Sequence, residues 1–163
     1  MIKVSSSGRY SKIFAFTHRE RSRVHPFLKI SFSNGMSLTL SEGHYTYVSG
    51  HLRAASAVRI GEAMKSDSGS TIVVSDIRKV WETGMYAPHT MQGDLVVNGV
   101  VVSAYTTEVS PALAHALLTP VRLVSLFTGI KEPFGNLFYR GCGFLRKAPL
   151  RRLISHLSRQ LYI

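Results

Sequence analysis

Two residues three positions apart, Ser41 and His44, are the strongest candidates for chemistry in this 163-residue sequence. An imidazole, with an ordinary pKa of about 6.5, can donate or accept a proton near neutral pH. A hydroxyl three residues earlier can orient that imidazole or hydrogen-bond a substrate amide. The alternative is structural: His44 begins a strand and packs against Tyr45 or Tyr47, and Ser41 forms a turn. So short a motif does not decide between the two interpretations.

Two further side chains are of reactive types. His18 could act as a general base, or it could simply be an exposed histidine beside Arg19 and Glu20. Cys142 is the only cysteine, which excludes an intramolecular disulfide framework and a multi-cysteine zinc site. We interpret Cys142 as an ordinary thiol. We expect no cofactor and no metal.

The composition is that of a folded, basic chain. Hydrophobic residues make up 45% of it, and no apolar run is long enough to span a membrane. Residues 1–8 do not resemble a signal peptide. The net charge is +11, and residues 131–163 hold seven Lys or Arg against one acidic residue. Such a tail favours phosphate-bearing partners, nucleic acid or anionic lipid, although a solvated basic surface explains it equally well.

The elements that must position these residues are predicted to be short strands as far as about residue 108. Asn34-Gly35 and Asn98-Gly99 are typical of two-residue hairpin turns, because both residue types tolerate a positive φ. The predicted strands cover 10–17, 26–32, 38–40, 44–48, 57–60, 71–74, 77–81, 94–97 and 100–105.

Helical patterns follow the strands. Ser110-Pro111 is typical of a helix start, Pro120 predicts a break, and 121–127 would form a second piece. Residues 149–162 have the pattern of a basic amphipathic helix. These patterns indicate an irregular all-β domain with a helical C-terminal appendage. The predicted division is a flexible N-terminus at 1–9, the domain at 10–128, and a basic loop and helix at 129–163.

Several segments together resemble one known family. In chain order they are Phe16-Thr-His-Arg19, Phe32 to His44, Gly84-Met-Tyr-Ala-Pro88, Gly93 to Tyr105, Ala114-His115 and Pro120-Val-Arg122. Hedgehog Hint domains, which are related to inteins, carry a similar "YAP(L)T" segment, a "G(T)LVVNGV…SCY" segment and an "AH…L.P.R" segment. The resemblance covers about Tyr10 to Leu126. It implies the Hint fold, in which short irregular antiparallel strands precede the helical appendage.

The resemblance also implies protein autoprocessing, so the chain would be a self-processing cysteine autopeptidase or acyl-transfer domain. In the family, an N-terminal cysteine attacks the carbonyl of the preceding glycine, and a second nucleophile, cholesterol in hedgehogs, cleaves the resulting thioester. His44 would protonate the departing amide nitrogen. Ser41 stands where the family usually has threonine. His18 stands where sterol-transferring hedgehogs have aspartate, which leaves sterol, water or another acceptor open.

Two other positions bear on the resemblance. Ala104 replaces the cysteine of "SCY", so the redox control linked to that cysteine is not expected here. His115, in the "AH" pair, is interpreted as a structural, hydrogen-bonded histidine.

The nucleophile itself is missing from the sequence. Nine residues precede Tyr10 and none is cysteine. We expect a truncated autoprocessing domain, inactive as it stands; the alternatives are a degenerate relative and a fragment completed in trans. The expected partners are the upstream segment of the same precursor, a sterol or water acceptor, and an anionic membrane surface bound by the C-terminal helix, with no specific nucleic acid. The family implies the secretory pathway or membrane association. The competing functions are a basic membrane- or nucleic-acid-binding module and a non-catalytic Hint relic.

Overall fold

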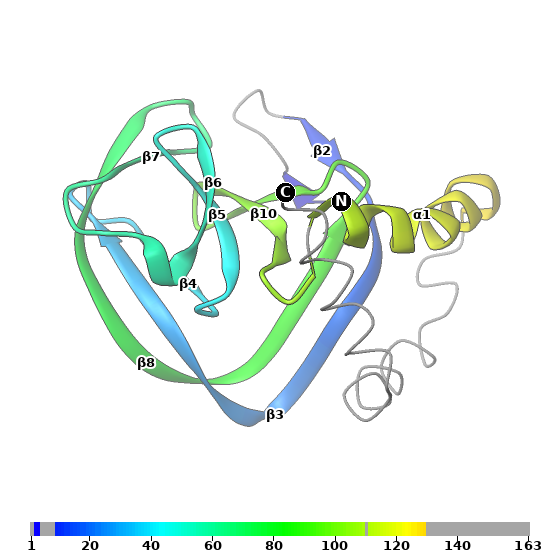
Figure 1. Cartoon of the computed structure of the whole chain (residues 1–163), viewed down its shortest axis with the longest axis horizontal. Helices are drawn as coiled ribbons and strands as arrows, with labels where there is room; N and C mark the ends of the chain where they lie inside the picture. The colour runs from blue at the N-terminus through cyan, green and yellow to red at the C-terminus, as the bar shows by residue number, and fades with distance from the viewer. Residues whose placement is uncertain (1, 4–8, 110, 130–163) are drawn as a thin grey trace, which may run out of the picture.

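The computed structural model describes residues 2–3, 9–109 and 111–129, and it confirms a mainly antiparallel β fold with one helix (Figure 1). Eight strands form a curled sheet in the order β4-β3-β8-β7-β5-β10-β9, with β6 paired to β5, and β1 pairs with β2. The elements are β1 Ile2–Lys3, β2 Tyr10–Ser11, β3 Ile13–Phe32, β4 Ser37–Leu40, β5 His44–Val48, β6 His51–Ala54, the 3-10 turn η1 Ala55–Ala57, β7 Ala63–Lys65, β8 Thr71–Thr90, β9 Asp94–Val97, β10 Val100–Thr106 and α1 Pro111–Thr128.

Two 20-residue strands, β3 and β8, dominate the architecture. They pair along their length and curve together from the side that carries α1 to the side that carries β4 and β7 (Figure 1). The sequence predicted two short strands in place of each. Residues 21–24 are exposed and include two arginines, so apolar alternation fails there, and the ladder skips residues 21–23 before it resumes at Val24. Four register shifts interrupt the pairing, and such irregularities let a long strand bend.

Both predicted hairpins form, but only Asn98-Gly99 makes the two-residue turn, because at Asn34-Gly35 the Phe32 amide donates to the Met36 carbonyl and leaves three residues in the loop. At Asn98-Gly99 both residues have positive φ, 47° and 77°, as a two-residue hairpin turn of the tightest kind requires. At Asn34-Gly35 only the glycine has positive φ, 83°, and the Asn34 side chain instead accepts a hydrogen bond from the Met36 amide at 3.1 Å.

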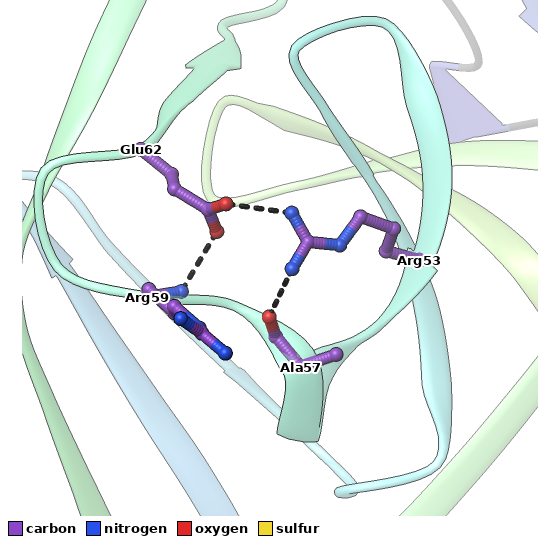
Figure 2. Close-up of polar contacts among 4 residues, drawn as sticks. All are labelled: Arg53, Ala57, Arg59 and Glu62. Carbon is purple, nitrogen blue, oxygen red and sulfur yellow. Dashed lines mark hydrogen bonds and ion pairs between the residues drawn. The ribbon is translucent and has the colours of Figure 1, made fainter.

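The expected strand at 57–60 is wrong. Ala55–Ala57 form η1, and the chain then turns toward β7. A polar network holds this segment (Figure 2): Arg53 donates to Glu62 Oε1 at 2.6 Å and to the Ala57 carbonyl, and the Arg59 amide donates to Glu62 Oε2 at 2.8 Å. Side-chain bonds therefore satisfy backbone groups that a strand ladder would otherwise pair.

The predicted helix break at Pro120 is also wrong, because α1 runs through it without interruption. Proline removes one backbone donor, but the residues on either side of it, Leu118 and Val121, are buried against the sheet and favour continuation. Within the described residues, no helix is long and apolar enough to cross a membrane. The helix expected at 149–162 lies outside the described residues.

The interior has two clusters. The larger one, here called the apolar core, is formed by strands from β3 to β10, and its members include Leu28, Ile30, Phe32, Leu38, Leu40, Val48, Met64, Ile72, Val74, Leu95, Val100, Val102 and Ala104. The smaller one lies where the first residues of β3 meet β10 and α1, and its buried members are Phe14, Ala15, Tyr105, Leu118 and Val121. The candidate site lies against the smaller cluster.

Candidate active site

A tight turn explains the spacing of Ser41 and His44. The His44 amide donates to the Ser41 carbonyl at 3.0 Å, which closes a four-residue turn just before β5. Gly43 approaches the chain after β10, where the Thr107 amide donates to the Gly43 carbonyl at 2.7 Å. A Cβ atom at position 43 would lie 2.6 Å from Thr107 Oγ1. The turn therefore leaves no room for a side chain at position 43 unless the Thr107 hydroxyl shifts, and it fixes where His44 begins the strand.

His44 is held in one tautomer by its surroundings. Its Nε2 lies 2.7 Å from the Ser103 carbonyl oxygen in β10. A carbonyl can only accept, so Nε2 carries the proton, and in the neutral ring Nδ1 carries the lone pair. Burial lowers the pKa of His44, and the bond to Ser103 opposes that shift. His44 is therefore an oriented, neutral imidazole with Nδ1 available to a substrate.

A tyrosine–aspartate pair supports the strands that carry this contact. Tyr47 in β5 donates to Asp94 Oδ1 at 2.7 Å, and Asp94 pairs in register with Ser103. Burial raises the pKa of Asp94 while the Tyr47 bond lowers it. Burial and the neighbouring carboxylate raise the pKa of Tyr47, so the phenol stays protonated. The pair links β5 to β9 across β10, the strand whose Ser103 carbonyl orients His44.

A second buried histidine, His89, lies near the end of β8, and the sequence interpretation missed it. Its Nε2 lies 2.9 Å from Thr17 Oγ1, and its side chain is 6% exposed. Its ring packs 6.4 Å from that of Phe14 and 5.6 Å from that of Tyr105. Burial, followed by Arg122 and His44, lowers the pKa of His89 to about 4. One signal was present in the sequence: a histidine follows Ala87-Pro88, where the hedgehog string "YAP(L)T" has leucine.

The helix α1 contributes a cation to this region. The Arg122 guanidinium lies over the Phe14 ring, 5.2 Å from its centroid, and donates to the Tyr105 hydroxyl at 3.4 Å. The two histidines, the arginine, Thr17 and Tyr105 form a group from five elements, here called the histidine cluster: Thr17, His44, His89, Tyr105 and Arg122.

The structure does not bring all the predicted site residues together. Ser41 lies beside His44 through the turn, with its side chain half-buried. His18 instead packs edge-on to His25, with ring centroids 6.5 Å apart. Ala104 is buried in the apolar core. Cys142 lies outside the described residues, and nothing is described of the His115 side chain within α1.

Within the described residues, no group of three or more His, Cys, Asp or Glu side chains could hold a metal ion. The histidine cluster itself brings together two imidazoles, two hydroxyls and a guanidinium.

Comparisons with known proteins agree with this fold. The family model for the Hint module matches residues 4–137. Warthog protein 6 of Caenorhabditis elegans is 30% identical over 141 residues, which cover 80% of this chain and 23% of that protein. Protein hedgehog of Drosophila ananassae is 29% identical over 141 residues, covering 77% of this chain and 29% of that protein. The chain thus spans less than a third of each of these two relatives.

Solved structures give the same architecture. The gp41-1 intein superposes with a TM-score of 0.53 at 13% identity, covering 63% of this chain and 81% of that one. The MchDnaB-1 intein superposes with a TM-score of 0.51 at 16% identity, covering 61% and 79%. These likenesses show the fold alone. With the family match, they establish that the chain belongs to the Hint module family, and its Warthog and hedgehog relatives make it a Hint domain of the hedgehog type.

Proposed function

We propose that this domain carries out protein autoprocessing within a longer precursor, with His44 as the group that moves the proton in the first step. The observation that carries the proposal is the 2.7 Å contact between His44 Nε2 and the Ser103 carbonyl, which leaves Nδ1 as the exchangeable site. An imidazole fixed in this way suits transfer of a proton to an amide nitrogen.

The proposed first step is an acyl shift from nitrogen to sulfur. A cysteine thiol attacks the carbonyl of the preceding residue, and its proton passes to His44 Nδ1. The carbon–sulfur bond forms, the carbon–nitrogen bond breaks, and Nδ1 returns the proton to the departing nitrogen. The lowered pKa of His44 suits this role, because a weakly basic imidazole gives its proton up readily. Ser41 would orient the amide or the imidazole from the adjoining turn.

The proposed nucleophile is a cysteine of a segment that precedes this domain in the precursor, because Cys142, the one cysteine of this sequence, follows the residues that resemble the family instead of preceding them. A hydroxyl compound, sterol or water, would then cleave the thioester, and His18 is the residue to which the hedgehog resemblance assigns its activation. The same resemblance supports a precursor that enters the secretory pathway. A non-catalytic Hint relic is the competing interpretation.

The test uses the longer protein read from the transcript, including the segment upstream of Met1. Incubation with dithiothreitol should release the upstream fragment, because a thioester reacts with thiols. His44→Ala should slow this release about 100-fold or more, the usual contribution of acid–base catalysis. His51→Gln, an exposed histidine on β6, is the matched control and should cleave normally. If the longer protein, with its cysteine present, stays intact in dithiothreitol, the proposed function is wrong.

A further inference from the structure

His89 has the features of a working group rather than of a packing residue. It is 6% exposed, its Nε2 is bonded to Thr17, and its Nδ1 is buried with no hydrogen-bond partner. An unpaired buried polar atom is unfavourable, so a leucine would fill this aromatic-lined place at lower cost. A buried imidazole with one unpaired nitrogen is unfavourable for stability, and unfavourable local features of this kind are found mainly at functional sites.

The groups that face His89 come from every element packed against it. Thr17 is on β3 and holds Nε2, Phe14 and Tyr105 cover the ring, and Arg122 and His44 are the charged or titratable neighbours on α1 and β5. A positive charge on His89 would be repelled by the Arg122 guanidinium and by any positive charge on His44. The ring is therefore neutral at pH 7. In the tautomer whose Nε2–H donates to Thr17 Oγ1, the unpaired Nδ1 carries a lone pair.

We propose that His89, rather than His18, accepts the proton in the second step of the reaction. This inference rests on the proposed function. A hydroxyl compound, water or an alcohol, attacks the thioester carbonyl, and its proton passes to His89 Nδ1. The carbon–oxygen bond forms and the carbon–sulfur bond breaks. The departing thiolate takes the proton back from His89, so the cysteine thiol and the neutral imidazole are both restored.

The two imidazoles then divide the two steps between them. His44 handles the proton while the amide bond breaks, and His89 handles it while the thioester bond breaks. Their electrostatic coupling disfavours two protons on the pair at once, so each step finds the other ring neutral. His18 is less suited to this work, because its ring packs edge-on to that of His25, although its backbone pairs with Ala87, two residues from His89.

The experiment uses the longer protein and separates the two steps by the attacking nucleophile. Dithiothreitol attacks as a thiolate and needs no base, whereas water or an alcohol does. Release of the upstream fragment is therefore measured under two conditions. The first contains dithiothreitol. The second contains a phosphine reductant and no thiol, and it is run both with and without an added sterol. His89→Leu should cleave with dithiothreitol at a rate within about threefold of the parent. Its thiol-independent cleavage should fall about 100-fold or more, the range of general base catalysis.

The variants separate the possible failures. If the parent does not cleave with dithiothreitol, the proposed function fails. If the parent cleaves under both conditions and His89→Leu loses neither activity, the function stands and the role of His89 is overturned. The role is also overturned if the thiol-independent cleavage is lost in His18→Ala but kept in His89→Leu. It is overturned as well if the His89→Leu protein is folded and has lost both activities. Should the leucine variant not fold, His89→Gln, which can still bond Thr17, takes its place.

A second readout needs no reaction at all. In the chain printed above, labelled imidazole signals should show His89 neutral at pH 6 and titrating near its lowered pKa of about 4. Titration of His89 near 6.5, the value of a free histidine, would overturn the proposal.

Discussion

The apolar core and the histidine cluster are built on opposite ends of the same two long strands, yet they do different work. At one end, Ile30 of β3 and Val74 of β8 are buried among aliphatic side chains. At the other, Phe14 of β3 lies beside His89 of β8, with a guanidinium over its ring. The first arrangement is favourable for burial, whereas the second buries ionisable groups at a cost. The difference indicates that one end of the ribbon supplies stability and the other chemistry.

The sharpest test of the stabilising end is Ile30→Ala. Ile30 is fully buried in the apolar core, so its truncation should lower the free energy of unfolding by about 2–5 kcal/mol, measured by urea denaturation. Ile60, which is 64% exposed, provides the matched control, and Ile60→Ala should change stability by no more than about 0.5 kcal/mol. Equal effects of the two substitutions would contradict the assignment of the core.

Burial of His89 in the histidine cluster should make the free energy of unfolding depend on pH. The pKa of His89 is about 4 in the folded chain and about 6.5 when unfolded, so below pH 6.5 the unfolded chain binds a proton that the folded chain does not. Stability should therefore fall by about 3 kcal/mol between pH 6.5 and pH 4. His89→Leu should remove that part of the decline and be at least as stable as the parent at pH 7.

Denaturant titrations at several pH values make this comparison, with exposed His51→Gln as the control. A leucine variant that keeps the full acid sensitivity would show that the cost lies in another group, with buried His44 the first to examine because its pKa is lowered in the same direction.

The sequence predicts a structural feature well where the residues that determine the feature are neighbours in the chain, and these two regions differ in that respect. The apolar core was accessible, because alternation around Leu28, Ile30 and Phe32 and the Asn98-Gly99 turn are encoded by neighbouring residues. The continuity of β3 and β8 was not, because residues 21–24 break the pattern, and the pairs on either side of the break, Glu20 with Met85 and Val24 with Thr83, join residues distant in the sequence. The helix through Pro120 likewise depends on packing against the sheet.

The candidate site shows the same limit. His44 and Ser41 belong to one turn, so their spacing carried the signal. The partners of His44 and His89 come from distant positions: Ser103 lies 59 residues after His44, and Thr17 lies 72 residues before His89. Periodicity contains no information on such contacts. His89 lies between the predicted strands 77–81 and 94–97, and it became visible only when the ring proved buried with one nitrogen unpaired.

The tyrosine–aspartate pair allows a milder test at the boundary between the two regions. Tyr47→Phe removes the only side-chain bond described for the Asp94 carboxylate, and should cost about 1 kcal/mol at pH 7, since both groups are half-buried. Because the bond lowers the pKa of Asp94, the variant should show a higher carboxyl pKa by NMR titration, and the stability difference should shrink as acid protonates Asp94. Tyr86→Phe, at an exposed tyrosine, is the matched control.

The smallest effect is expected at the network in Figure 2, which belongs to neither cluster. Glu62→Gln weakens the ion pair with Arg53, and the partly exposed side chains limit the loss to about 0.5–1 kcal/mol. Arg53 and the backbone bonds hold the pKa of Glu62 below 4.5, so this contribution is present above that pH and fades as pH falls through the lowered value. Glu82→Gln, at an exposed glutamate on β8, controls for the loss of charge. Cleavage of the longer protein should be unchanged in both variants, because the loop contacts neither histidine; a slower cleavage in Glu62→Gln alone would mean that the site extends further along β5 than the histidine cluster.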